Sequence, residues 1–356
     1  MNEVSRRFVK RGYTCMVYCR KSSYPGERPE RHEGRRLVYV KGSSRPELET
    51  FVSALQTGWH LLRHRSEYDY VLWFNNANLP GIVMTLLAGL PTSINTDGLE
   101  WRRAKWRWPF KAYAFLSSFL VSRICKSLIS DARVIQSYYK KTFFKDTEFI
   151  PYGIPDVLDI SSEKEAAVLE RYGLEAGRYF LQLTRFEPEN HVLDTAKAFR
   201  DSGLAKEGFK LLLLGYKDAP YARQVKAMSG KNGIVVPDYE SDPEVKTVLW
   251  SNCFCYVHGN SVGGTNPGLL EAMSNCARVI AIDVPFSREV LGNTGYFFIL
   301  DNMAKSLREV LHYPDQSAAM QNRVRSHYDW DAVAESYMRL VEGRPANYSP
   351  PAIAKY

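Results

Sequence analysis

Short apolar runs alternate with longer stretches of helical periodicity along most of the chain. The apolar runs are continuous rather than alternating with polar residues, so we expect strands that are buried on both faces. Parallel sheets covered by helices have this pattern, and two successive series of such units predict two doubly wound α/β domains. The predicted strands cover residues 13–19, 70–74, 91–95 and 127–130 in the first series, and 179–183, 210–214, 233–236, 253–257 and 279–282 in the second.

Helical periodicity fills the intervals between these strands. The predicted helices cover 45–64, 80–88 and 105–126, then 191–200, 219–228, 243–250 and 267–274, and finally 331–341. Two prolines and a glycine interrupt the pattern at 149–155, which places a domain boundary there. We therefore expect an N-terminal domain over 1–152, a C-terminal domain over 153–327, a last helix within 328–342 and a loose tail over 343–356.

The first domain has an unusual start. A doubly wound domain normally opens with a strand, a glycine turn and a helix. Residues 1–11 already have the pattern of that helix, with Val4 and Phe8 on one face. We therefore expect that the first strand and its Gly-Gly turn are missing from the sequence as given.

Composition narrows the class of protein. The chain has 356 residues, enough for two cores, and its 45% hydrophobic and 24% charged residues exclude a disordered chain. The net charge of +8 favours an anionic partner, and nucleotide-sugars, anionic lipids and nucleic acid all fit. The six cysteines are scattered, which is typical of reduced thiols in a cytosolic protein. With no signal peptide and no spanning apolar segment, the pattern predicts a cytoplasmic protein.

A glycine turn followed by a proline separates the predicted strand 253–257 from the helix 267–274. The sequence from 258 to 273 is HGNSVGGTNPGLLEAM. Main-chain amides of such a turn converge at a helix N-terminus and bind a diphosphate without a cation. Glu271, one turn into the helix, is a candidate for the ribose hydroxyls, although an ordinary glycine turn with a helix glutamate also fits. The candidate donor-binding residues at the turn are His258, Gly263, Gly264, Thr265 and Asn266.

A second polar loop follows the predicted strand 179–183. Arg185 lies where the carboxyl end of that strand meets the crevice in which open α/β sheets bind ligands. Its guanidinium is suited to bidentate contact with phosphate oxygens. A surface ion pair with Glu187 or Glu189 explains the arginine equally well, so both interpretations stay open.

Basic and aromatic residues gather between 101 and 111. This composition fits a lipid interface, an amphipathic helix whose tryptophans enter the core, or a nucleic-acid surface. We favour the membrane surface, which the apolar stretch 115–120 would extend. The residues of this basic aromatic patch are Trp101, Arg102, Arg103, Lys105, Trp106, Arg107 and Trp108.

Four segments together resemble the rhamnosyltransferase-like branch of the family 4 glycosyltransferases. They are NTDGLEWRR at 95–103, LTRFEPENH at 183–191, HGNSVGGTNP at 258–267 and VPFSREVLG at 284–292. The resemblance covers essentially the whole chain. It implies a GT-B fold, in which two Rossmann-like domains face each other across a cleft and the last helix crosses back to the first domain. It also implies sugar transfer with retention at the anomeric carbon and without a metal.

The resemblance also implies roles for single residues. Arg185 and the turn 263–266 would hold the donor diphosphate, and Glu271 would face the ribose. Two positions depart from the wider family: Gly263 stands where the first of two glutamates is found, and Asn190 stands where a phosphate-binding lysine is common. Both changes are usual in this branch, so they bear on the identity of the donor.

Asp97 stands where broader relatives carry a histidine, in a loop just after a predicted strand. A carboxylate there can orient an acceptor hydroxyl or serve as general base, and Glu100 is the second candidate for this catalytic role. Taken alone, an Asp-Gly pair is more often a plain turn. Only the resemblance makes Asp97 a catalytic candidate.

These expectations combine into one function. The sequence predicts a retaining glycosyltransferase that moves a deoxyhexose, rhamnose from dTDP-rhamnose, to a lipid-linked or growing polysaccharide acceptor. It would need a nucleotide-sugar but no cofactor or metal, and would lie at the inner face of the plasma membrane, with nucleic acid not expected as a partner. The alternatives are a degenerate nucleotide-sugar-binding protein without catalysis and a GT-B-like nucleotide-sugar epimerase.

Overall fold

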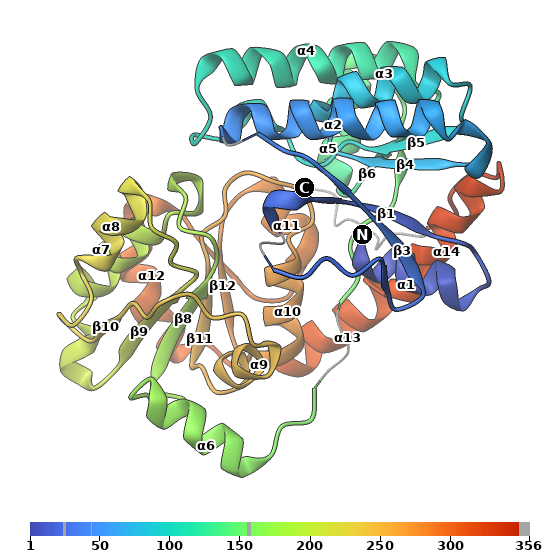
Figure 1. Ribbon diagram of the computed structural model, residues 1–356. Helices are drawn as coiled ribbons and strands as arrows, with labels where there is room; N and C mark the ends of the chain where they lie inside the picture. The colour runs from blue at the N-terminus through green and yellow to red at the C-terminus, as the bar shows by residue number, and fades with distance from the viewer. Residues whose placement is uncertain (24–25, 44, 155–157, 349–356) are drawn as a thin grey trace. The chain divides into compact units, whose positions relative to one another are not determined.

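The computed structural model describes residues 1–23, 26–43, 45–154 and 158–348. These residues form two compact units (Figure 1). The first unit contains Met1–Arg102, Trp106–Tyr152 and the described residues from Trp330 onward, and the second contains Gly153–Asp329 together with Arg103–Lys105. The end of the predicted tail lies outside the described residues.

The strands of the first unit form two sheets. In one, with strand order β1-β3-β2, β3 runs parallel to β1 and antiparallel to β2; in the other, with order β4-β5-β6-β7, all strands are parallel. The strands are β1 Met16–Arg20, β2 Arg31–His32, β3 Arg35–Val40, β4 Val71–Phe74, β5 Thr92–Asn95, β6 Ser127–Ser130 and β7 Glu148–Phe149. All four strands predicted for this part are confirmed. The pattern missed β2 and β7, which have two residues each, and β3, which opens with two arginines.

Helices cover these sheets, and α2, α3 and α4 run side by side in one layer (Figure 1). The helices of the first unit are α1 Asn2–Lys10, α2 Pro46–Arg63, α3 Leu79–Leu87, α4 Trp108–Ile124, α5 Arg133–Phe143 and α14 Trp330–Val341. The helix predicted over 105–126 begins three residues later, because Pro109 occupies its first turn and favours a helix start. Val4 and Phe8 of α1 share a buried core with Val333 of α14 and Ile129 of β6.

The second unit contains one parallel sheet of order β10-β9-β8-β11-β12-β13. Its strands are β8 Tyr179–Leu183, β9 Lys210–Leu214, β10 Ile234–Val235, β11 Cys255–His258, β12 Val279–Ile282 and β13 Tyr296–Phe298. The five strands predicted here are confirmed, and β13 is added at the edge. The strands are continuous apolar runs because helices cover both faces, as Figure 1 shows.

The helices of the second unit follow the strands in turn. They are α6 Ser162–Arg171, α7 Val192–Ser202, α8 Pro220–Lys226, α9 Pro243–Ser251, α10 Pro267–Asn275, α11 Pro285–Leu291, α12 Met303–Glu309 and α13 Ser317–His327. Four of them begin at a proline, whose fixed φ suits the first helical turn and whose missing N–H would have no partner there. These starts explain why the strand-to-helix loops were readable from the sequence. The fold is mixed α/β with parallel, Rossmann-like sheets.

Candidate functional site

The strand order of the second unit reverses between β8 and β11. From β8 the chain adds β9 and then β10 on one side, and it then returns to the other side of β8 to add β11, β12 and β13. β8 and β11 pair directly, with Phe180 opposite Cys255. In open parallel sheets the loops separate at such a reversal and leave a crevice outside the carboxyl ends of the two strands. Both polar loops singled out in the sequence begin at this point.

Hydrogen bonds hold the two loops together. The Ser261 amide donates to the Glu189 carbonyl oxygen at 3.0 Å, and the Ser261 hydroxyl donates to the same oxygen at 2.9 Å. The Thr184 hydroxyl donates to Asn260 Oδ1 at 3.2 Å. Segments almost eighty residues apart in the sequence therefore form one rigid rim.

Gly259 is required where the loops meet. A Cβ at this position would lie 2.5 Å from the Asn190 carbonyl oxygen and 2.9 Å from Gln182 Nε2. Gln182, at the end of β8, donates to the same Asn190 oxygen at 2.8 Å. Only a glycine allows the β11 loop to approach the β8 loop this closely.

Asn190 is buried and holds the backbone of its own loop. Its amide nitrogen donates to the Arg185 carbonyl oxygen at 2.8 Å and to the Thr184 hydroxyl at 3.2 Å. The sequence predicted that Asn190 binds the sugar donor. In the structure its side-chain N–H groups bind instead within the loop that carries Arg185. The structure therefore shows the Asn190 amide bound to the backbone of Arg185.

Arg185 is exposed at the carboxyl end of β8. Across the described residues it forms no ion pair with Glu187 or Glu189, the partners that the alternative interpretation required. The Glu189 carboxylate is instead buried, 5% exposed, and neither of its oxygens has a hydrogen-bond partner within the described part of the chain. The guanidinium of Arg185 is available to a ligand.

Helix α10 starts at the glycine turn, as predicted. Asn266 caps it: its Oδ1 accepts a hydrogen bond from the Gly268 amide at 2.9 Å, and Pro267 occupies the first turn. Gly263 has φ +156, and a Cβ there would meet open space. Neither Gly263 nor Gly264 donates its amide to another of the described residues in the hydrogen-bond network. Gly263 and Gly264 lie just before the N-cap of α10, in the loop that follows β11.

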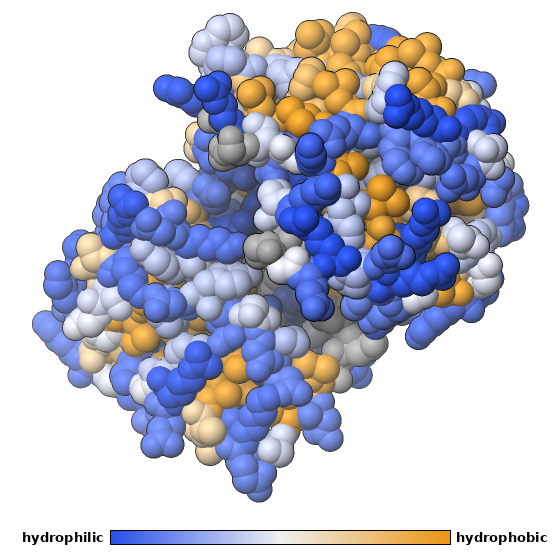
Figure 2. All heavy atoms as spheres, viewed as in Figure 1, coloured by the Kyte–Doolittle hydropathy of each residue, from blue (hydrophilic) through white to orange (hydrophobic). Residues whose placement is uncertain are grey.

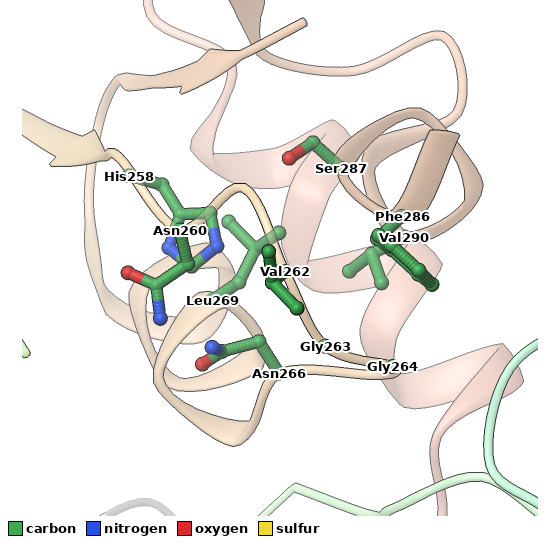
Figure 3. A pocket seen from close by; sticks show the side chains of 10 residues that line it. All are labelled: His258, Asn260, Val262, Gly263, Gly264, Asn266, Leu269, Phe286, Ser287 and Val290. Carbon is green, nitrogen blue, oxygen red and sulfur yellow. The ribbon is translucent and has the colours of Figure 1, made fainter. Parts of the chain in front are cut away.

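A small cavity lies behind this turn, lined by the turn, Leu269 and residues of α11 (Figure 3). Its volume of about 10 Å³ accommodates roughly one water molecule. His258 Nδ1 and Ser287 Oγ line it, are buried, and have no partner within the described residues. Burial lowers the pKa of His258 to about 3, so its imidazole is neutral at pH 7. Thr265 is also buried at the turn.

Glu271, one turn into α10, is half-buried. Burial raises the pKa of its carboxyl, and the charge of Lys246 opposes that shift. Among the residues that the structure describes, no group of three or more His, Cys, Asp and Glu side chains is placed to hold a metal ion.

The first unit contains a second polar cluster at the carboxyl ends of its strands. Asp97, after β5, has φ +56, and its Oδ2 accepts a hydrogen bond from Asn75 Nδ2, after β4, at 3.1 Å. Asp131, after β6, is 2% exposed. Burial first, and then the charges of Asp131 and Asp97, raise the pKa of the Tyr152 hydroxyl. Parallel strands bring these residues together at one edge of the sheet.

Sequence reasoning missed Asn75 and Asp131. Each immediately follows a strand that the pattern had placed, so a search for polar residues at carboxyl ends of parallel strands would have found them. Glu100, the second catalytic candidate, accepts a hydrogen bond from Trp106 Nε1 at 2.8 Å and lies in a short 3₁₀ turn after the Asp97 loop. The Glu100 carboxylate therefore holds the Trp106 indole.

The basic aromatic patch contains half-buried and exposed side chains. The Trp101 ring contacts Phe115 and Tyr138, and the Trp106 ring lies 4.2 Å from that of Phe110, so these two tryptophans pack on the protein. Trp108 is 76% exposed. Arg102 and Arg107 are exposed, while Arg103 and Lys105 are half-buried.

Comparison with known proteins finds two family models that match parts of the chain. Residues 170–327 match the family described as "Glycosyl transferases group 1", and residues 85–155 match a domain of unknown function, DUF1972. No curated protein matches the sequence.

Solved structures match nearly the whole chain. Sucrose-phosphate synthase from Thermosynechococcus elongatus has a TM-score of 0.78 at 15% identity, covering 96% of this chain and 91% of that one. HepE of Anabaena in complex with UDP has a TM-score of 0.70 at 13% identity, covering 96% and 94%. A glycosyltransferase from Rickettsia africae also scores 0.70 at 13% identity, covering 96% and 93%. The chain therefore has the GT-B fold, and its residues 170–327 are similar to the glycosyl transferases group 1 family.

Proposed function

We propose that the protein is a retaining glycosyltransferase that transfers a deoxyhexose, rhamnose from dTDP-rhamnose, to a lipid-linked or growing polysaccharide acceptor in cell-surface glycan synthesis. One observation carries this proposal. At the strand-order reversal, Arg185 has no ion pair among the described residues, and its loop is hydrogen-bonded to the loop that contains the Gly263-Gly264 turn, within the region that matches the group 1 family. That combination fits the diphosphate of a nucleotide-sugar.

The donor would be held by its diphosphate at the α10 N-terminus and Arg185. Transfer breaks the bond between the anomeric carbon and a diphosphate oxygen, and the departing diphosphate gains negative charge. The Gly263 and Gly264 amides and Arg185 stabilise that charge, which lowers the barrier because they are already oriented before reaction. Glu271, one turn further along α10, would accept hydrogen bonds from the ribose hydroxyls.

The acceptor would meet the cluster of the first unit. Its hydroxyl oxygen bonds to the anomeric carbon on the face that the diphosphate leaves, and its proton passes to the leaving diphosphate or to Asp97. Asn75 holds Asp97 through the 3.1 Å hydrogen bond, and this restraint keeps a strained, left-handed residue in place.

The resemblance and the structural neighbours point to different nucleotides in the donor. The resemblance to the rhamnosyltransferase-like branch favours dTDP, whereas the structural neighbour HepE was crystallised with UDP and with UDP-glucose. The acceptor we propose is membrane-bound, at the inner face of the plasma membrane. Of the described helices, none has the length and apolar character needed to cross a bilayer.

A two-stage experiment tests the function. A thermal-shift panel of dTDP-, UDP- and GDP-sugars first identifies the donor, and donor consumption is then followed with and without a lipid-pyrophosphate-linked glycan. We expect dTDP-rhamnose to raise the melting temperature most and to be consumed only with acceptor. Consumption without acceptor would instead indicate an epimerase, and binding without consumption a non-catalytic binding protein.

A further inference from the structure

Helix α4 directs its large apolar side chains outward. Its buried face consists of small residues, Ala114, Ser117, Ser118, Val121 and Ser122. Its outward face carries the exposed side chains of Leu116, Leu120 and Ile124. It also carries those of Phe115 and Phe119, whose rings contact Phe143 as well. A surface helix of a water-soluble domain normally has the reverse arrangement, with its apolar stripe toward the core.

Helix α2 has the same inverted arrangement. Its exposed apolar residues repeat at helical spacing: Leu48, Phe51, Leu55, Trp59 and Leu62. Its buried face includes Ser53, Ala54, Thr57 and Gly58. These small residues have a packing reason, because a Cβ on Gly58 would lie 2.9 Å from the Gly81 Cα of α3. Two of the outward apolar residues, Leu55 and Trp59, line an open hollow together with Val40 of β3 and Met84 of α3.

The two outward faces belong to one surface. The Phe51 ring of α2 lies 6.1 Å from the Tyr113 ring of α4, and Leu87 of α3 is 79% exposed. Figure 2 shows apolar residues gathered over this layer of helices. Large contiguous apolar patches on soluble proteins mark interaction sites with a partner protein or a membrane.

Charge decides between these two kinds of partner. Residues 101–126 contain seven basic residues and no acidic one, and α3 has no charged residue. Arg107 and Lys126, both exposed, flank the two ends of α4. A symmetric dimer would place this basic surface against its own copy, which like charges disfavour. Anionic lipid headgroups neutralise such a rim while the acyl boundary accepts the apolar side chains.

We propose that the outward face of α2, α3 and α4 binds to an anionic bilayer surface, with its Leu, Phe and Trp side chains at the boundary between headgroups and acyl chains. The inference deepens the proposed function, on which it rests for the lipid-linked acceptor. It assigns membrane contact to the helix layer and its exposed Trp108, while Trp101 and Trp106 pack on the protein.

Vesicle co-sedimentation without donor or acceptor tests the proposal separately from catalysis. The native chain is mixed with vesicles of phosphatidylglycerol and phosphatidylcholine in equal parts, and with phosphatidylcholine alone. The variant combines Leu116→Ser, Phe119→Ser and Leu120→Ser. Its matched control combines Ile299→Ser and Leu300→Ser, which replace exposed apolar residues of the second unit.

We expect the native chain and the control to bind phosphatidylglycerol vesicles. The α4 variant should bind them at least about tenfold more weakly. Added salt should weaken native binding, since exposed charges contribute to it. The proposal is overturned if the native chain does not bind, or if the α4 variant binds equally well. It is also overturned if light scattering shows a native dimer that the variant converts to a monomer.

Discussion

Removal of Arg185 is the most direct test of the donor site. The arginine lies at the carboxyl end of β8, with its guanidinium exposed and its backbone held from behind by Asn190. Arg185→Ala removes the guanidinium and leaves the carbonyl that Asn190 binds. Since the side chain has no ion pair within the described residues, we expect the unfolding free energy to change by less than about 0.5 kcal/mol.

The effect on catalysis should be much larger than the effect on stability. A charge-assisted hydrogen bond to a phosphate contributes about 1.5–3 kcal/mol. Each 1.36 kcal/mol corresponds to a factor of ten in rate, so the loss should lower kcat/KM by about 10- to 150-fold. Arg185→Lys should recover only part of this, because an ammonium cannot form the bidentate contact of a guanidinium.

The assay measures kcat/KM for donor consumption with a saturating acceptor, together with the melting temperature. Arg200→Ala is the matched control, since Arg200 lies exposed on α7 of the same unit and pairs with Asp201 away from the two loops. If Arg185→Ala and Arg200→Ala both retain the native kcat/KM, the Arg185 guanidinium does not bind the diphosphate and the donor site is wrongly placed.

Three further predictions concern other parts of the molecule. Gly259→Ala should destabilise the chain by about 1–3 kcal/mol and weaken donor binding, because its Cβ would overlap the Asn190 carbonyl; unchanged melting and donor affinity would refute the loop lock. Asp97→Asn should lower kcat by about a hundredfold or more with an unchanged donor KM, whereas the exposed Asp146→Asn should not, and native kcat in the first variant would exclude the general-base role. Because the pKa of His258 is about 3 in the folded state, below its ordinary value of 6.5, stability should fall as pH decreases from about 6.5, by ~2 kcal/mol at pH 5. His258→Gln should flatten this dependence in urea unfolding, and identical slopes would show that the imidazole is not buried as described.

Much of the local structure at the proposed donor site was readable because its signals are local. Gly263, Asn266 and Pro267 specify a turn and a helix start within a few residues, and the structure has that cap and that start. Arg185 was readable because it ends an apolar run. What the sequence left open was its partner, and the structure settles that the nearby glutamates do not pair with it. Distances between loops depend on how the strands pack together, so local sequence patterns do not predict them.

The acceptor cluster and the helix layer show the limit of pattern reading. Asp97, Asn75 and Asp131 follow three different strands, so their proximity depends on the strand order and on parallel pairing. Helix α4 contains both a stripe of small residues and a stripe of large apolar ones, and periodicity alone does not tell which of them faces the core.

The sequence by itself determined the longer apolar strands, many of the helices and the polar loops that follow two of the strands, because these follow from short-range periodicity and turn chemistry. Only the tertiary structure decided that β8 and β11 are neighbours, which places the two loops at one crevice, and that the apolar stripe of α4 faces outward. Both depend on which segments pack together, and packing is set by contacts between residues far apart in the chain.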